Sequence, residues 1–245
     1  MKIRILGEYA PYPAPDGATA GYLVDTGTGR FLIDCGSGVL SELLKHISLQ
    51  ELQGVIITHY HADHVADLGV LQYAIMVARK TGSRVDPLPI YANQEPPNKF
   101  QDVTYRSDVQ AIPLNAGSVI QLCGARLTFT ETVHSSSCLA VSVEQDGKKF
   151  VFSADTGPSP FLEQFAQNAD LFICEASWLQ KDQGPASVGH LTALQAGEMA
   201  QKANVKKLCL THIYPGYDRE ELRREAAEVF KREIIVAEKG MVLEV

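Results

Sequence analysis

The sequence predicts an α/β protein in which two β-sheets pack face to face and helices cover their outer surfaces. Short β-branched, apolar runs alternate with segments of helical spacing along the whole chain. The two halves contain similar segments, since GVIITHYHADH and KLCLTHIYPGYD are both apolar strands that end in Thr-His before a helix. No low-complexity linker or shift in composition divides the 245 residues, so we expect one domain over residues 1–245.

The first part of the chain is predicted to contain strands, two helices and a proline-rich stretch. The run GVIIT is β-branched and predicts a buried strand, and residues 64–80 have helical spacing. Four prolines in residues 85–97 leave room only for the short strand PIYA. The predicted elements are strands at residues 1–7, 21–25, 30–34 and 54–58, and helices at 39–46 and 64–80.

The middle of the chain is predicted to be rich in strands, and helices return after it. Asp146-Gly147 lies between two apolar runs and is a strong hairpin signal. Three helix starts are marked by Ser159-Pro160, by Thr192 with Gln195, and by Asp218 with Glu221. The predicted strands are residues 118–121, 126–133, 139–144, 149–153, 170–175 and 207–211, with two short strands at the end.

Charge and hydropathy exclude several classes of protein. The chain has 22 Lys and Arg against 29 Asp and Glu, a formal charge of −7, which argues against general binding of nucleic acid. The longest mainly apolar stretch, residues 69–78, is too short to span a membrane. Without a signal-peptide pattern, and with five cysteines but no CxxC motif, the chain is expected to be cytoplasmic, with its thiols acting as small buried hydrophobes.

Three of the seven histidines lie within six residues, in the motif His59-Tyr60-His61-Ala62-Asp63-His64. The motif follows a predicted buried strand and precedes a helix. His59 and His61 are two apart in an extended turn, so they can share one metal ion, while Asp63 and His64 can face a second. Imidazole and carboxylate groups suit zinc and similar divalent ions. The alternative is a surface cluster of histidines without a ligand.

Three further polar residues follow predicted strands in the same way, namely His134, Asp155 and His212. Singly, each is also compatible with a solvated or capping group. Together they predict one sheet edge at which seven ligands gather and one carboxylate bridges two metals. These seven are His59, His61, Asp63, His64, His134, Asp155 and His212.

The order of these motifs resembles the metallo-β-lactamase superfamily: HYHADH, a lone His, the Asp of FSADTG and the His of LTH. LIDCG also resembles the early strand of that superfamily, whose Asp supports the metal loop. The resemblance covers nearly the whole chain and implies a four-layer αββα sandwich with two divalent metal ions at one edge. It assigns one ion to His59, His61 and His134, the other to Asp63, His64 and His212, and the bridge to Asp155. Zn²⁺ is the expected ion, with Mn²⁺ or iron as alternatives.

Two further segments resemble the ribonuclease Z-like phosphodiesterase branch. Glu175 lies in CEAS and His190 in GHLT; the resemblance implies that this His lies beside the scissile phosphate and that the Glu orients it. His190 also precedes a predicted helix N-terminus, which would suit a phosphate. The alternatives are an ordinary residue at a helix start and a plain carboxylate at a strand end.

These features predict a two-metal phosphodiesterase in which a bridging hydroxide attacks phosphorus. Asp63 is expected to orient the nucleophile, and His190, held by Glu175, to protonate the leaving alkoxide. Only 34 residues separate Asp155 from His190, and no long arm for gripping tRNA is present, so a small phosphodiester is expected as substrate rather than extended nucleic acid.

Other readings remain open from sequence alone. A lactonase or thioesterase would keep the same ligands, a tRNA 3′-processing endoribonuclease would share the Glu175 and His190 segments, and a non-catalytic metal-binding module is the third class. The apolar face of residues 69–78 also leaves a homodimer open.

Overall fold

Two seven-stranded sheets form the centre of the computed structural model, which describes residues 1–245 apart from the side chain of Ala186. The first sheet has the order β14 (Val242–Glu244), β1 (Lys2–Gly7), β2 (Gly21–Asp25), β3 (Arg30–Ile33), β4 (Leu52–Ile57), β5 (Leu88–Asn93) and β6 (Val109–Leu114). The second sheet has the order β13 (Glu233–Val236), β12 (Lys207–Thr211), β11 (Leu171–Glu175), β10 (Lys148–Phe152), β9 (Leu139–Gln145), β8 (Ala125–Glu131) and β7 (Val119–Leu122).

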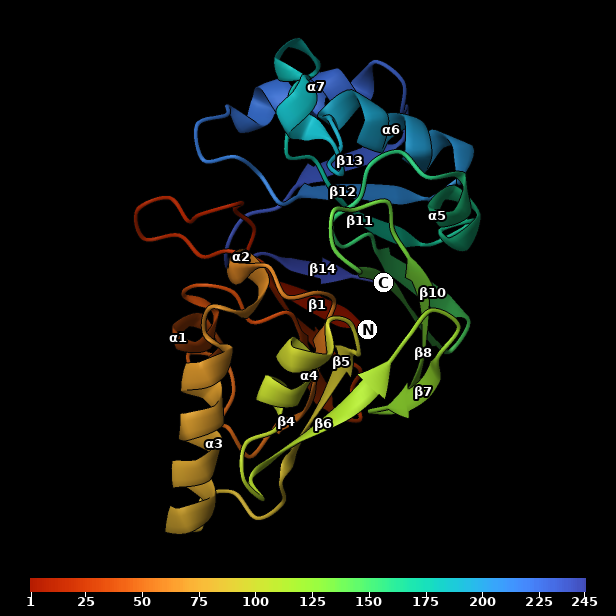
Figure 1. Ribbon diagram of the computed structural model, residues 1–245. Coiled ribbons are helices and arrows are strands. Elements are labelled where there is room, and N and C mark those ends of the chain that lie inside the picture. The colour runs from red at the N-terminus through yellow and green to blue at the C-terminus, as the bar shows by residue number, and fades with distance from the viewer.

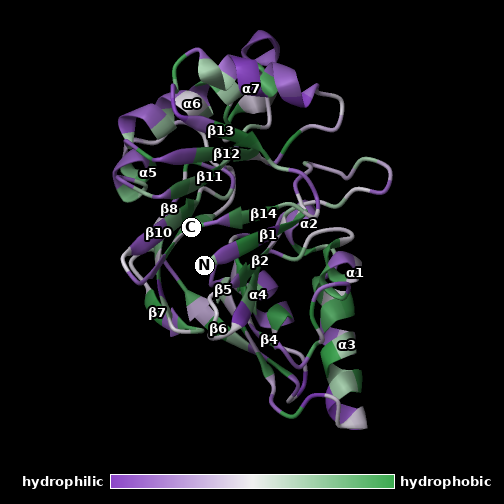
Figure 2. Cartoon of the chain, turned by 180° about the vertical axis from the view of Figure 1, so that it is seen from behind, coloured by the Kyte–Doolittle hydropathy of each residue, from purple (hydrophilic) through white to green (hydrophobic). Residues whose placement is uncertain are grey.

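Helices cover the outer face of each sheet (Figure 1). The helices of the first half are α1 (Val39–Leu43), α2 (Ala62–Val65), α3 (Leu68–Thr81) and α4 (Pro97–Val103). Those of the second half are α5 (Pro160–Phe165), α6 (Ala193–Lys202) and α7 (Arg219–Ala227), with the 3₁₀ turns η1 (Gln180–Asp182) and η2 (Pro185–Ser187). In Figure 2, α7 is largely hydrophilic, whereas much of α3 is hydrophobic.

Three groups of buried apolar side chains separate the four layers. One lies between the sheets and includes Tyr22 and Phe152, whose ring centroids are 4.6 Å apart. A second lies between the first sheet and its helices, and a third between the second sheet and its helices. Because each sheet buries both faces, its central strands are apolar throughout rather than alternating. This is the predicted αββα sandwich.

Strand direction brings the polar strand ends to one edge. In the second sheet, β8 to β10 are antiparallel neighbours and β10 to β13 are parallel neighbours, so β8, β10, β11 and β12 run in the same direction. Their carboxyl ends therefore meet at one edge, as do those of the parallel strands β3 to β6 in the first sheet. The terminal strands β1 and β14 pair antiparallel, so the two chain ends lie side by side (Figure 1).

Some predicted elements were wrong in their limits. The helix expected at residues 64–80 is divided into α2 and α3, because Cys35 donates its N–H to the carbonyl of His64 and accepts from the N–H of Asp67. The helix predicted at 39–46 ends at Leu43. Asp218 caps α7 as expected, but Glu221 binds Lys181 instead of returning to the cap.

Two elements, α4 and β6, were not predicted, and each contains a proline at a position that tolerates it. Pro97 lies at the start of α4, a position where a missing N–H costs nothing. Pro113 lies in β6, an edge strand, where a ladder hydrogen bond can be spared. None of the helices in the described part of the chain is long and apolar enough to cross a membrane.

Candidate metal centre

The seven predicted ligands meet at the shared edge of the two sheets. His59 follows β4, His61 is the residue immediately before α2, and Asp63 and His64 lie within α2. The other three follow strands of the second sheet: His134 comes after β8, Asp155 after β10 and His212 after β12. The site is therefore built from both sheets, and ligands 153 residues apart in the sequence lie in one cluster.

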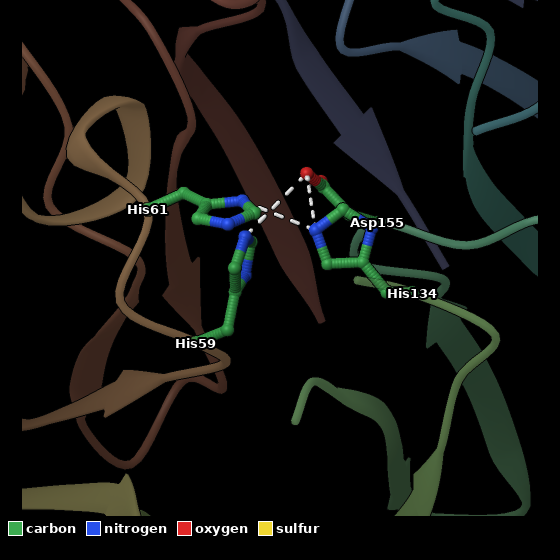
Figure 3. A group of neighbouring side chains, drawn as sticks. All are labelled: His59, His61, His134 and Asp155. Carbon is green, nitrogen blue, oxygen red and sulfur yellow. Dashed lines mark hydrogen bonds and ion pairs between the residues drawn. The ribbon is translucent and has the colours of Figure 1, made fainter. Parts of the chain in front are cut away.

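His59, His61, His134 and Asp155 form the first group of converging side chains (Figure 3). Nε2 of His134 lies 3.1 Å from Nδ1 of His61, and Nε2 of His59 lies 3.5 Å from Oδ2 of Asp155. One donor atom from each of the four residues lies within 4.8 Å of all the others. Four such atoms around one point suit a tetrahedral divalent ion.

Asp63, His64 and His212 form the second group. The Nε2 atoms of His64 and His212 are 3.2 Å apart, and Oδ2 of Asp63 lies 3.3 Å from Nε2 of His212. Oδ1 of Asp155 lies 3.1 Å from His64 Nε2 and 3.2 Å from His212 Nε2. Asp155 therefore presents one carboxylate oxygen to each group.

Buried polar atoms support a pair of cations at this place. Within the described residues, His59 Nε2 and Asp155 Oδ1 are buried without a hydrogen-bond partner, although other polar atoms lie close to them. Such atoms are costly in a protein interior unless something satisfies them. Close contacts that lack hydrogen-bond geometry are expected when ligands point at a common centre rather than at each other. The His/Asp cluster thus fits a binuclear metal site.

Outer hydrogen bonds fix the orientation of the imidazoles. Nδ1 of His134 donates to the carbonyl of Gly189 over 2.9 Å, and Nδ1 of His64 donates to Oδ2 of Asp34 over 2.8 Å. Both acceptors leave the Nε2 lone pair directed into the cluster. The hydroxyl and N–H of Thr58 also donate to Asp34, which is fully buried. Contacts of this kind orient ligands and raise their basicity.

Burial and charge decide the protonation of the cluster. Burial lowers the pKa of His59, His61 and His134, so these rings are neutral and able to bind a cation at neutral pH. Burial would also lower the pKa of His64, but the carboxylates of Asp155 and Asp34 outweigh it and raise this pKa well above its ordinary value. The carboxylates that favour a proton on His64 would equally attract a metal ion.

Glu175 lies at the end of β11 and joins His190 to the cluster. Its Oε1 accepts from the N–H of Thr156 over 2.6 Å and from Nδ1 of His190 over 3.1 Å. Its Oε2 accepts from the hydroxyl of Ser177 over 2.7 Å and from the N–H of Leu191 over 3.1 Å. A fully buried carboxylate with four donors cannot rotate, so it holds the His190 ring in one orientation.

Ser177 extends this network to the metal ligands. Its hydroxyl donates to Glu175, so it accepts from Nδ1 of His212 over 2.8 Å. Burial alone would lower the pKa of His190, but the hydrogen bond and negative charge of Glu175 outweigh it and raise this pKa to about 9. Nε2 of His190 is left free of the Glu175 contact, and His190 lines the same cavity as Asp63 and Asp155.

The expected phosphate site at the N-terminus of α6 is not present. The first N–H groups of this helix are bound within the chain, and Thr192 and Gln195 form the predicted capping box. Ala193 donates to the Trp178 carbonyl, Leu194 to Glu225 Oε1 and Gln195 to Thr192 Oγ1. The helix positions His190 but offers no free N–H group from these three residues.

A cavity of about 350 Å³ opens beside the cluster. The cluster residues in its lining are His61, Asp63, Asp155, His190 and His212. Its remaining walls are mostly apolar or aromatic and come from the β1–β2 connection and from residues that follow β11 and β12. His46 lies elsewhere, bound to Glu42 on α1, as expected for a histidine without a role in the site.

Comparisons with known proteins agree with this geometry. A family model described as a beta-lactamase superfamily domain matches residues 29–213. The chain belongs to the metallo-β-lactamase superfamily. It is 35% identical to the protein of Bacillus subtilis (strain 168) described as probable metallo-hydrolase YhfI, with 100% of both chains covered. The crystal structure of that protein superposes with a TM-score of 0.96 over 100% of this chain and 99% of the other.

Less similar proteins include two whose names describe enzymes that act on phosphate esters or anhydrides. Ribonuclease Z of Archaeoglobus fulgidus is 27% identical, with 100% of this chain and 98% of the other covered; the alignment extends over 305 positions, against 245 residues here. A diphosphatase from the PhnP family has the same fold, with a TM-score of 0.77 at 19% identity over 100% and 97% of the chains. With its His/Asp cluster, this member of the superfamily is a metallo-hydrolase.

The structure brings together the nine residues singled out from the sequence, but the contacts that hold them were not predicted. Thr58, Ser177 and the carbonyl of Gly189 were missed. A weak signal existed for Thr58, since Thr precedes His in both of the similar segments, GVIITHYHADH and KLCLTHIYPGYD. The roles of Ser177 and Gly189 depend on tertiary contacts with His212 and His134, which are 35 and 55 residues away.

Proposed function

We propose that this protein hydrolyses small phosphodiesters with two bound divalent ions, Zn²⁺ being the first choice and Mn²⁺ or iron the alternatives. The observation that carries the proposal is the His190–Glu175 pair, held at the rim of the metal cluster by a buried carboxylate with four donors. The pair holds a protonated ring where an alkoxide leaving group of a phosphodiester would need a proton. A lactone or β-lactam also releases an oxygen or nitrogen that must be protonated, so a comparison of substrates distinguishes these classes.

The ligands divide as their geometry suggests. His59, His61 and His134 would hold one ion, and Asp63, His64 and His212 the other, with Asp155 between them. When bound, such ions supply a hydroxide near neutral pH and stabilise negative charge on phosphate oxygens. The structure also brings Asp155, His190 and His212 within 4.8 Å of one another, so a metal-binding role for His190 is the competing reading of this residue.

His190 would act by moving a proton. Its Nδ1 donates to Glu175, so the proton available to a substrate is on Nε2. A pKa of about 9 keeps the ring protonated at neutral pH, as a general acid requires. Asp63 belongs to the second ligand group and also lines the cavity, where its carboxylate would accept a hydrogen bond from the attacking water.

The lining of the cavity favours a small substrate. Neither Lys nor Arg is found among the described residues that line it. A polynucleotide is normally held through many Lys and Arg contacts to phosphates. The chain is also too short to contain the additional positions of the ribonuclease Z alignment, in keeping with the missing arm.

A leaving-group comparison tests the proposal. We expect His190→Ala to lower kcat on an alkyl phosphodiester by roughly 100-fold or more, with a much smaller loss on bis-p-nitrophenyl phosphate, because p-nitrophenolate needs little protonation. Metal content should equal that of the wild type. His46→Ala is the matched control, since His46 contacts Glu42 and does not line the cavity, and it should leave both rates unchanged.

Other outcomes identify the competing functions. Loss of metal together with both activities would show His190 to be a ligand. Faster hydrolysis of a homoserine lactone than of any phosphodiester would establish the lactonase reading. Efficient, strongly salt-sensitive cleavage of a 3′-extended tRNA would restore the processing-nuclease reading. If the metal-loaded protein hydrolysed none of these substrates, the result would favour a non-catalytic metal-binding module.

A further inference from the structure

Three aromatic side chains line the cavity beside the metal cluster, and the metal chemistry uses none of them. They are Tyr12, Trp178 and Tyr214, here called the aromatic rim. Tyr12 is 51% exposed and Tyr214 38% exposed, so both rings are accessible from the solvent. Exposed rings at the opening of a site are suited to stacking against a flat ligand.

The rim is held in shape by its own packing. Tyr12 and Tyr214 meet edge to face, with ring centroids 6.1 Å apart and planes at 87°. Tyr214 packs in turn against Tyr217, at 5.2 Å and 75°, and the Tyr217 hydroxyl donates to Asp182 over 2.9 Å. Gly216 makes room for this arrangement, since a Cβ atom there would lie 2.6 Å from Cε1 of Tyr214.

Trp178 forms the third part of the rim and is fixed through its backbone. Its N–H donates to the carbonyl of Leu191, and its carbonyl accepts from Ala193 at the start of α6. The indole Nε1 is buried without a hydrogen-bond partner among the described residues. Trp178 is also the single tryptophan of the chain, so its fluorescence reports on this wall of the cavity alone.

Charge limits what the rim can accept. The lining contains no Lys or Arg among its described residues, and two cations on neighbouring segments are already paired. Lys181 lies 2.6 Å from Glu221, and Arg219 lies 2.6 Å from Glu8. Apart from the metal cluster and His190, little positive charge is therefore available to a second phosphate. A ligand with one phosphodiester charge and a neutral flat ring matches this environment.

We propose that the aromatic rim binds a nucleobase, which makes the substrate class a singly charged phosphodiester of a mononucleoside. This rests on the proposed phosphodiesterase function and adds the group attached to the phosphate. Aromatic residues stack on any base without reading its sequence, so the rim gives selectivity for a ring rather than for one base. A cavity of about 350 Å³ suits a ligand of this size rather than an oligonucleotide.

Paired substrates separate the ring from the phosphate. Adenosine 3′,5′-cyclic phosphate carries the base, and the 3′,5′-cyclic phosphate of methyl riboside lacks it. We expect metal-loaded wild type to prefer the base-bearing substrate in kcat/KM. Tyr214→Ala should lower that kcat/KM by roughly 5- to 150-fold, mostly through KM, because one base stack is lost. The abasic substrate should be unaffected, and Tyr214→Phe should retain wild-type preference.

Tyr73→Ala provides the matched control, since Tyr73 is an exposed tyrosine on α3 that does not line the cavity. It should leave both substrates unchanged. If Tyr214→Ala lowered kcat/KM equally for both substrates, Tyr214 would have only a structural role, and base binding by the aromatic rim would be contradicted. Equal kcat/KM values for the two substrates in wild type would overturn it as well.

A binding measurement keeps the rim testable if the proposed function fails. Titration of the metal-loaded protein with 5′-AMP should quench Trp178 fluorescence at lower concentration than titration with ribose 5-phosphate. We expect this difference even if no phosphodiester is hydrolysed. That outcome would contradict the proposed phosphodiesterase function but not base binding by the aromatic rim. Equal affinities for the two probes would overturn the rim, whichever reaction the protein catalyses.

Discussion

At the residue scale, the chemistry depends on imidazole rings whose outer nitrogens have permanent acceptors. His64, His134 and His212 each direct Nδ1 to an oxygen atom outside the cluster. Their Nε2 atoms consequently point inward as lone-pair donors. Asp155 completes this arrangement: burial would raise its pKa, but His212, His64 and His59 hold it well below the usual range, so the carboxylate is ionised and available to two cations.

Removal of the bridging carboxylate should abolish binuclear binding. We expect elemental analysis of gently purified wild type to approach two divalent ions per chain, and Asp155→Ala to contain clearly fewer. Asp86→Ala, at an exposed position away from the cluster, should bind the wild-type amount. An Asp155→Ala protein with no metal but full activity and stability would refute the site assignment.

Ser177 permits a test of the contacts behind the ligands. Ser177→Ala removes the acceptor for His212 Nδ1 and one donor to Glu175. Loss of such a contact typically costs roughly 10- to 100-fold in metal affinity or activity, so chelator competition should show weaker binding. Ser177→Thr should restore part of it.

Ser142→Ala is the control for Ser177, because its buried hydroxyl has no hydrogen-bond partner among the described residues. It should bind metal as the wild type does. Similar affinities for Ser177→Ala and Ser142→Ala would mean that the His212 ring is oriented by packing alone.

At the scale of elements, the turns and helix caps that depend on neighbouring residues were predicted from the sequence. The Asp146-Gly147 turn joins β9 and β10 with both residues at positive φ, and the Ser159 hydroxyl accepts from Leu162 N–H as a cap should. The break between α2 and α3 was not predictable, since it depends on Cys35, about 30 residues earlier. Helical spacing continues across the break and gives no indication of it.

Two glycines in helices should respond to substitution in opposite directions. Gly69 in α3 is exposed, and a Cβ atom there would meet nothing within 4 Å, so Gly69→Ala should stabilise the protein by about 0.5–1 kcal/mol through lower unfolded-state entropy. Gly197 in α6 is buried against α7, and a Cβ atom would lie 2.7 Å from the Ala226 carbonyl. Gly197→Ala should therefore destabilise.

Chemical denaturation with unchanged m-values would measure both effects. Stabilisation by Gly197→Ala would show that α6 and α7 can separate without loss, contrary to their close packing in this structure.

At the scale of the whole molecule, the site lies where the two sheets meet. The HYHADH segment follows β4 of the first sheet, whereas His134, Asp155 and His212 follow strands of the second. The sequence could predict these residues because polar groups recur at strand ends and in a known order. It could not predict the aromatic rim, whose members are separated in sequence by up to about 200 residues and have no shared local pattern. Whether the hydrophobic face of α3 mediates a homodimer stays a prediction.

Ligands drawn from both sheets imply that bound metal stabilises the fold as a whole. A ligand present at about 100 times its Kd stabilises the folded state by about 2.7 kcal/mol per site, and 1 kcal/mol shifts Tm by roughly 2–4 °C in a chain of this size. Removal of both ions by a chelator should therefore lower Tm by roughly 10 °C or more in thermal denaturation. Added Zn²⁺ should reverse the shift.

The Asp155→Ala protein distinguishes this linkage from a direct effect of the chelator. Because its binuclear site is already disrupted, its Tm should start below that of the wild type and should change little when the chelator is added. If wild type containing two ions instead lost them with no change in Tm, the ligands would have to keep their positions without metal. The buried, unpartnered atoms of His59 and Asp155 argue against that, since their burial would then be uncompensated in the metal-free fold.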